Sequence, residues 1–203
     1  MDALFGLVLL AVAFTSGRPP ATSPSVEGAT SGPAMQLTAR LGGVIPPGQS
    51  TGFARDADGS LAIVDRARQV VIRLDANGQP RGEWGPHFGP GLDARDLLGV
   101  APDGDGWYLL DRGAQRILRL TAQGAAQAER TIDVSSLATY GPTALATDAR
   151  GNLFMADTGR DRVVVFDSNG RLSGEIGQSG TNLGQLKQPM ALSFGPDGSL
   201  FVS

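Results

Sequence analysis

A repeat with a period of 46 residues restricts the fold of this chain more than any other feature of its sequence. Three short apolar runs end in an aspartate, and these aspartates lie 46 residues apart: Asp65, Asp111 and Asp157. Two further sets have the same spacing: Gly78, Gly124 and Gly170, and Glu83, Glu129 and Glu175. A fixed period of this length indicates an array in which copies of one supersecondary unit stack on one another.

Each copy consists of short apolar runs separated by turn sequences, which predicts four strands per copy. In the third run the two faces alternate, with Ile72, Leu118 and Val164 on one side and Arg73, Arg119 and Val165 on the other. The turns 75–78, 121–124 and 167–170 end in a glycine that can adopt positive φ. No stretch after residue 35 shows a sustained helical face. The pattern predicts an all-β fold, a β-propeller built from four-stranded blades.

The predicted blades are three complete copies with partial blades at both ends. Residues 37–42 are typical of the outer fourth strand of a blade, and the fourth copy, 189–203, provides two inner strands. An open fan of this kind exposes the apolar face of its end blade. We therefore expect the chain to be a fragment of a longer gene, or a protomer covered by a partner.

The segments 144–177 and 177–203 carry a specific family likeness. Their features follow the order Pro, apolar strand, Asp-x-x-Gly turn, apolar strand, Ala-Asp, Arg-containing apolar strand and a second Asp-x-x-Gly turn. On these motifs, residues 36–203 closely resemble the NHL-repeat family. The second copy departs from the pattern, with an altered first turn at 102–106 and with Thr121 in place of the turn aspartate.

The NHL resemblance implies a propeller that is usually six-bladed. At 46 residues per blade, a ring of that size would need about 100 residues more than this chain holds. Some NHL propellers bind RNA on a basic face, whereas related propeller enzymes use several histidines around zinc or a carboxylate and amide cluster around calcium.

The first 34 residues have a different character from the repeats. Residues 3–14 are apolar but too short to span a bilayer comfortably. Residues 1–16 therefore resemble a signal peptide, or an anchor if they are retained, and 17–34 form a linker rich in Pro, Ser, Thr and Gly. We expect the propeller at 35–203 to be an exported bacterial protein, periplasmic or extracellular, with membrane contact only through the N-terminal segment.

Composition excludes most familiar catalytic chemistry. The chain has no cysteine and one histidine, His87, which excludes disulfides, thiol nucleophiles, cysteine-bound metals and a three-histidine zinc site. Its net charge of −3 argues against nucleic acid or an anionic membrane as the main partner. No Gly-rich phosphate loop or Gly-x-Ser-x-Gly elbow is present.

The repeated aspartates could suggest a Ca²⁺ or Mg²⁺ site around an axis. Their equal repetition favours a structural role instead, in which each carboxylate accepts backbone N–H bonds in the turn that follows. Arg116 and Arg162 lie five residues after their aspartates, where the first copy has Val70, and we expect them to form ion pairs between blades or to pack through their stems. The repeated glutamates should be solvated on the outermost strands.

Other polar residues are weaker candidates. Five arginines fall in equivalent turns and could form a basic crescent: Arg66, Arg68, Arg112, Arg160 and Arg162. His87 lies in a Gly/Pro-rich connection and should simply be exposed. Four asparagines fall in turns or connections, away from any calcium cluster: Asn77, Asn152, Asn169 and Asn182.

These observations favour a non-catalytic NHL-like module that binds a protein or peptide with its loops. They assign no catalytic, metal or cofactor-binding residue, and they leave the binding residues open. One alternative is a propeller-type hydrolase or lyase with a metal near the central channel. The other is a structural subunit whose open blade faces are covered by a neighbour.

Overall fold

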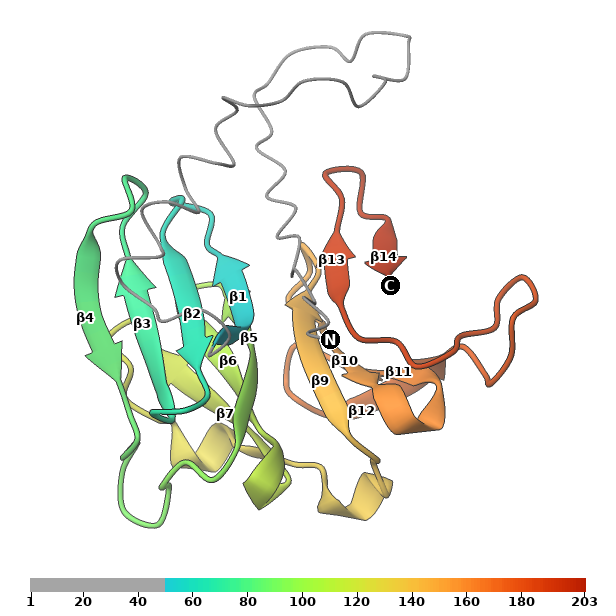
Figure 1. Ribbon diagram of the computed structural model, residues 1–203, viewed down its shortest axis with the longest axis horizontal. Coiled ribbons are helices and arrows are strands. Elements are labelled where there is room, and N and C mark those ends of the chain that lie inside the picture. Colours follow the sequence, from blue (N-terminus) through green and yellow to red (C-terminus); the bar gives the residue numbers. More distant parts are fainter. Residues whose placement is uncertain (1–49) are drawn as a thin grey trace, which may run out of the picture. The chain divides into compact units, whose positions relative to one another are not determined.

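The computed structural model of this chain describes residues 50–203. Within these residues the fold is all-β, with three four-stranded antiparallel sheets and one two-stranded sheet (Figure 1). This arrangement confirms the predicted fold class. The expected signal or anchor at 1–16, the linker at 17–34 and the outer strand at 37–42 lie outside the described residues.

The strands follow the repeat in order. Blade one contains β1 (Ser50–Arg55), β2 (Leu61–Asp65), β3 (Val70–Leu74) and β4 (Pro80–Trp84). Blade two contains β5 (Leu97–Asp103), β6 (Gly106–Asp111), β7 (Arg116–Thr121) and β8 (Ile132–Asp133). Blade three contains β9 (Pro142–Thr147), β10 (Leu153–Asp157), β11 (Arg162–Phe166) and β12 (Leu172–Ile176). The last sheet pairs β13 (Leu192–Phe194) with β14 (Leu200–Val202).

The middle strands of each complete blade are buried, and in blades two and three this is because another sheet packs on each face. On β6, Leu109 joins an apolar cluster with Val64 of blade one, whereas its neighbour Leu110 joins a cluster with Met155 of blade three. Alternate residues of one strand thus serve two interfaces, which explains why these runs are apolar without interruption. The outer strand β12 is mostly exposed.

The innermost strands β1, β5, β9 and β13 lie beside one another in sequence order (Figure 1). A Cβ added at Gly52 of β1 would lie 2.3 Å from the backbone oxygen of Leu98 on β5. Glycine is therefore required at this position for the first two blades to approach as closely as they do.

The turns between third and fourth strands form as the sequence predicts. In the first of them, the Gly78 N–H donates to the Asp75 oxygen at 2.9 Å, and Gly78 has a φ of 78°. The equivalent Gly124 and Gly170 have φ values of 85° and 79°.

Blade two departs from the pattern after its third strand. Glu129 lies in a 3₁₀ turn, Ala128–Arg130, and the fourth strand is reduced to Ile132–Asp133. The prediction that Glu129 lies on an outermost strand is therefore wrong. The Ala-rich stretch 125–128 lacks the β-branched alternation that a strand needs. It keeps only one bridge to β7, between Ala126 and Leu120, before the chain turns away and pairs with β7 again at β8.

Candidate functional site

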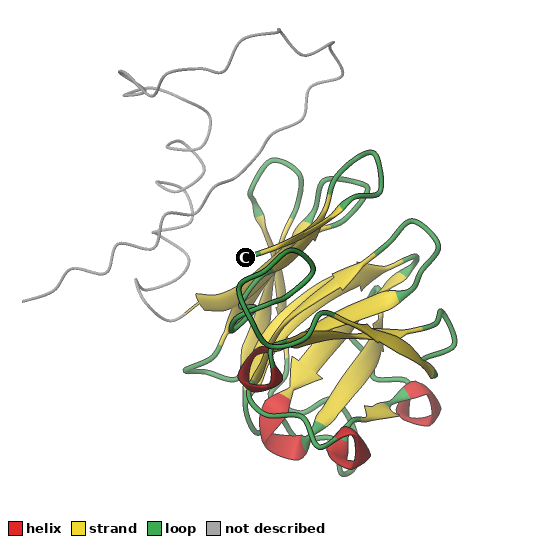
Figure 2. Cartoon of the chain, turned by 90° about the vertical axis from the view of Figure 1, so that its right-hand side faces the viewer, coloured by secondary structure: helices red, strands yellow, loops and turns green. Residues whose placement is uncertain are grey.

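The 3₁₀ turns gather at one end of the sheets (Figure 2). We call this end the connector face. It comprises the loops after β2, β6 and β10 and the connections between blades: 66–69, 112–115 and 158–161, with 85–96, 134–141 and 177–191.

Asp111 ties the connection from blade one onto blade two. Its buried carboxylate accepts N–H bonds from Arg95 at 3.2 Å, Asp96 at 3.0 Å and Ala114 at 3.3 Å. Its other oxygen pairs with the guanidinium of Arg116 at 3.0 Å, and Arg116 also donates to the backbone oxygen of Asp93 at 2.7 Å. The predicted backbone bonds of this aspartate are confirmed.

Asp157 does the same for blade three. It accepts the Tyr140 N–H at 2.7 Å and pairs with Arg162 Nε at 2.9 Å, while Arg162 donates to the Leu137 oxygen at 2.9 Å. Burial alone would lower the pKa of the Arg162 guanidinium, but hydrogen bonds to Asp157 and Glu175 outweigh it and raise this pKa.

The pairs of Arg116 and Arg162 lie within a blade, which corrects the expectation of ion pairs between blades. The reason is the antiparallel register, which places Arg116 directly opposite Asp111 and Arg162 directly opposite Asp157. The other guanidinium N–H groups of each arginine donate to backbone oxygens of the connection that leads into its blade. We call this arrangement the Asp–Arg latch.

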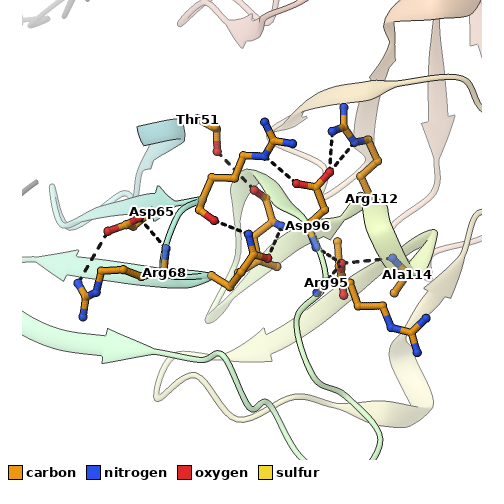
Figure 3. A network of polar contacts seen from close by, with 11 residues as sticks. Thr51, Asp65, Arg68, Arg95, Asp96, Arg112 and Ala114 are labelled. Atoms are coloured by element: carbon orange, nitrogen blue, oxygen red, sulfur yellow. Dashed lines mark hydrogen bonds and ion pairs between the residues drawn. The ribbon is translucent and has the colours of Figure 1, made fainter. Parts of the chain in front are cut away.

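Blade one has a weaker version, because Val70 stands opposite Asp65. The Asp65 carboxylate accepts the Arg68 N–H at 3.0 Å, and its buried Oδ2 forms a long ion pair with the Arg68 guanidinium at 3.8 Å (Figure 3). Among residues 50–203 this Oδ2 accepts no hydrogen bond. Arg68 pairs more closely with Glu83, at 2.7 Å from Nη1 to Oε1. This hydrogen bond lowers the pKa of Glu83.

The repeated glutamates are exposed, as expected, but two of the three are also ion-paired. Glu83 pairs with Arg68, and Glu175 pairs with Arg162 at 2.5 Å. The exposed outer strands are thereby fastened to the connector face.

A bridge between blades centres on Asp96 (Figure 3). Its carboxylate pairs with Arg66 of blade one at 2.7 Å and with Arg112 of blade two at 2.6 Å. Burial alone would raise the pKa of Asp96, but the bonds from the two arginines outweigh it and hold this pKa below its ordinary value. The repeat does not point to Asp96, because the equivalent positions in the other two blades are Ser50 and Pro142.

Most of the proposed basic crescent is therefore neutralised by carboxylates. Arg66, Arg68, Arg112 and Arg162 each form an ion pair. Among residues 50–203, no carboxylate lies within 4.0 Å of the Arg160 guanidinium, whose side chain is exposed.

The remaining candidates are peripheral. His87 is exposed, and its Nδ1 lies 2.7 Å from Asp93 in the same connection. The asparagines lie in turns or connections, as predicted; the Asn152 N–H, for example, donates to Asp148 at 2.9 Å. Among residues 50–203, no group of three or more carboxylate or histidine side chains is placed to hold a metal ion.

A hollow of about 420 Å³ opens on the connector face beside blade three. It is lined by the exposed ring of Tyr140, by the loop after β10 and by the connection that follows β12. Sequence reasoning did not identify it. Three polar residues at the 46-residue spacing were the available sequence signal: Gln69, Gln115 and Asp161. In the structure all three adopt positive φ. The side chains of Gln69 and Asp161 accept the backbone N–H groups of Leu97 and Gln188, respectively, from the chain that follows their blades.

No helix in the described part of the chain is both long enough and apolar enough to span a membrane.

The stacked four-stranded sheets define residues 50–203 as β-propeller blades. Solved propeller structures agree. A nidogen/laminin complex matches with a TM-score of 0.61 and 22% identity, over 75% of this chain and 56% of that one. A streptogramin B lyase matches with a TM-score of 0.58 and 18% identity, over 78% of this chain and 49% of that one. A gluconolactonase from Xanthomonas campestris matches with a TM-score of 0.58 and 19% identity, over 76% of this chain and 53% of that one.

This chain thus spans about half the length of these three structures. At these identities the likeness shows the fold alone. No protein-family model and no curated protein sequence matches the chain.

Proposed function

We propose that this chain is a non-catalytic, NHL-like propeller module that presents its connector face to a protein or peptide partner. We also propose that it acts in the periplasm or outside the cell, with residues 1–16 directing export or serving as an anchor. A rigid array of blades with variable loops suits recognition.

The observation that carries the proposal is a division of labour on the connector face. Repeated residues such as Asp111 and Asp157 are buried and hold the connections in place. Residues that do not repeat remain free to contact a partner: Tyr140, Leu183 and Met190 are large, apolar and exposed. Exposed apolar side chains on a fixed frame favour binding of another chain over catalysis.

The nidogen/laminin complex supports this function, because it places a fold of this kind in an assembly of proteins. The lyase and the gluconolactonase support the alternative of a propeller-type enzyme equally at the level of the fold. The repeated aspartates favour the binding function over the enzyme, because the carboxylates of Asp111 and Asp157 already accept backbone N–H groups.

Panning the full 203-residue chain against phage-displayed peptides tests the binding function. We expect a family of related peptides that bind with a Kd in the micromolar range, about 1–100 μM. The heat-unfolded chain is the control. If no peptide is enriched, and a lactone or ester is turned over when Ca²⁺ or Mg²⁺ is added, the binding function is wrong and the enzyme alternative holds.

Fractionation tests the location. We expect the full chain in the periplasmic, membrane or extracellular fraction, and a chain without residues 1–16 in the cytoplasm. A full-length chain found wholly in the cytoplasm would contradict export.

A further inference from the structure

We propose that the hollow beside blade three binds a neutral saccharide, with one face of a sugar ring stacked on Tyr140. We call this site the Tyr140 hollow. The inference goes beyond the proposed function and does not depend on it, because it adds a small-ligand site to the connector face. The volume of about 420 Å³ lies within the range of about 300–1,000 Å³ that is usual for such sites.

One wall of the Tyr140 hollow is an aromatic ring on a fixed backbone. The Tyr140 N–H donates to the buried Asp157 at 2.7 Å, and the Tyr140 oxygen accepts the Gly159 N–H at 2.7 Å. A Cβ added at Gly159 would lie 2.0 Å from Cδ1 of the ring, so the ring rests directly on the glycine. The side chain is nevertheless 72% exposed, which leaves the ring available to a ligand.

This aromatic wall belongs to blade three alone. In blade two, Arg95 takes the place of Tyr140: its N–H donates to Asp111, and its Cβ would lie 2.8 Å from a Cβ added at Gly113. An arginine at this position offers no aromatic face to a ligand. The repeated framework is therefore the same in the two blades, and the ring is what distinguishes this hollow.

The opposite wall is fastened to the same blade. Asp161 accepts the Gln188 N–H at 2.7 Å and the Ser179 hydroxyl at 2.6 Å, and the Thr158 hydroxyl donates to the Pro189 oxygen at 2.7 Å. These bonds join the loop after β10 to the connection after β12. The hollow is therefore preorganised, which reduces the entropy that a ligand must overcome on binding.

The lining of the Tyr140 hollow is electrically neutral. It contains one carboxylate, Asp161, and one ammonium group, Lys187. Hydrogen bonds from Ser179 and Gln188 lower the pKa of Asp161, and the charge of Lys187 lowers this pKa further, so the carboxylate is ionised at neutral pH and balances the lysine. A lining with no net charge does not favour an acidic or a basic ligand.

Four polar groups of the lining are available to a ligand. Among residues 50–203 they have no hydrogen-bond partner: the hydroxyls of Tyr140 and Thr181, the ammonium of Lys187 and the side-chain amide of Gln188. Hydroxyl and amide groups both donate and accept, as the hydroxyl groups of a sugar do. The C–H groups on one face of a sugar ring are apolar and pack against an aromatic ring.

The composition of the lining favours a saccharide over a peptide. The lining has one aromatic side chain and no aliphatic one, and its other side chains are polar. A peptide anchored in a hollow needs an apolar pocket for a large side chain, because such anchors provide most of the affinity of a protein interface. A sugar needs one ring and a set of mixed donors and acceptors, which this lining provides.

A glycan array probed with the labelled full chain tests the ligand class. The array carries neutral, sulfated and sialylated glycans, and the glycans that bind are then titrated in solution by saturation-transfer NMR. We expect neutral glycans to bind with a Kd of about 0.1–5 mM, which is suitable for a shallow and open site. Sulfated or sialylated glycans should bind no more tightly than their neutral counterparts.

Variants of the full chain test the site. Tyr140→Leu keeps a large side chain but removes the aromatic face, so it should weaken binding at least about tenfold, whereas Tyr140→Phe should weaken it at most about threefold. Lys187→Gln keeps a donor and removes the charge, so binding should change by less than about twofold. The matched control is Leu172→Ala, an exposed apolar residue of β12 outside the lining, which should leave binding unchanged.

Four results would overturn the proposal. If the full chain binds no neutral glycan, the ligand class is wrong. If neutral glycans bind Tyr140→Leu as tightly as the original chain, they bind elsewhere. Preference for acidic glycans, lost in Lys187→Gln, would show that the hollow selects charge. A peptide that binds the full chain and is lost in Tyr140→Leu, with no glycan competing, would assign the hollow to a peptide.

Discussion

At the scale of single residues, the repeated aspartates are structural anchors. Asp111 and Asp157 each combine backbone N–H bonds with an arginine on the neighbouring strand, and both carboxylates are fully buried. A buried carboxylate with this many partners cannot also serve as a metal ligand or a general base without losing them. The same geometry that makes the latch thus removes these groups from chemistry.

Replacing the aspartate should cost more stability in blade two than in blade one. Asp111→Ala leaves Arg116 without its counter-charge in a mostly buried site, so we expect the free energy of unfolding to fall by about 3 kcal/mol. Asp65→Ala removes one backbone bond and should cost about 1–2 kcal/mol. Urea denaturation of the full chain measures both. Equal losses would mean that neither Arg116 nor the two additional backbone bonds of Asp111 contribute to stability.

The Asp96 bridge should make stability depend on pH. Because the folded pKa of Asp96 is below its unfolded value, the bridge stabilises fully above about pH 4 and is lost as the pH falls through the folded pKa. Asp96→Asn should therefore cost about 1–2 kcal/mol at pH 7, and the deficit should shrink below pH 4. Thermal unfolding across this range tests it, with the exposed Asp105→Asn as control.

At the scale of elements, neighbouring blades interlock through side chains as well as through backbone. The guanidinium of Arg73 on β3 lies 4.3 Å from the ring of Trp84 and 5.2 Å from that of Trp107 on β6. The ring of Trp84 also packs over Gly124 in the turn of blade two. The outer strands of blade one therefore pack against blade two through these side chains.

A side chain at Gly124 should disturb this contact. A Cβ there would lie 2.1 Å from Cδ1 of Trp84, so Gly124→Ala should cost about 2–3 kcal/mol and change the tryptophan fluorescence. Gly78→Ala is the matched control, because Gly78 has nearly the same φ and nothing within 4 Å of its added Cβ. It should cost about 1 kcal/mol, from backbone strain alone, and leave the fluorescence unchanged.

The repeat predicted strand number, turn type and the role of Asp65, Asp111 and Asp157, because these features recur at a fixed period that a single sequence displays. It failed at Glu129, which lies in a 3₁₀ turn and not on a strand. It also failed to identify Asp96 and Tyr140, which do not recur at the 46-residue spacing and which contact the blades from the connections between them. Periodicity reveals what every blade needs, but a binding site depends on what one blade has alone.

At the scale of the whole array, each sheet covers one face of the sheet before it. Phe154 on β10 is only 9% exposed because Phe194 on β13 packs against it, with ring centroids 4.9 Å apart. Phe201 occupies the equivalent position on β14, and among residues 50–203 no further sheet covers it, so it is 63% exposed. Phe201 is therefore a large apolar side chain left uncovered at a position that blade three buries.

We expect the 203-residue chain to associate through the face that carries Phe201. Burial of a phenylalanine side chain is worth about 2–3 kcal/mol, and the unpaired edge of β14 offers backbone groups to a second strand. Light scattering after size-exclusion chromatography should show species larger than a monomer, with binding of a hydrophobic dye. Phe201→Ser should reduce both signals, whereas Ser193→Ala, which lies opposite Phe201 in the register, should not. A compact monomer that binds no dye would contradict the expectation, because the face would then be tolerated in water uncovered.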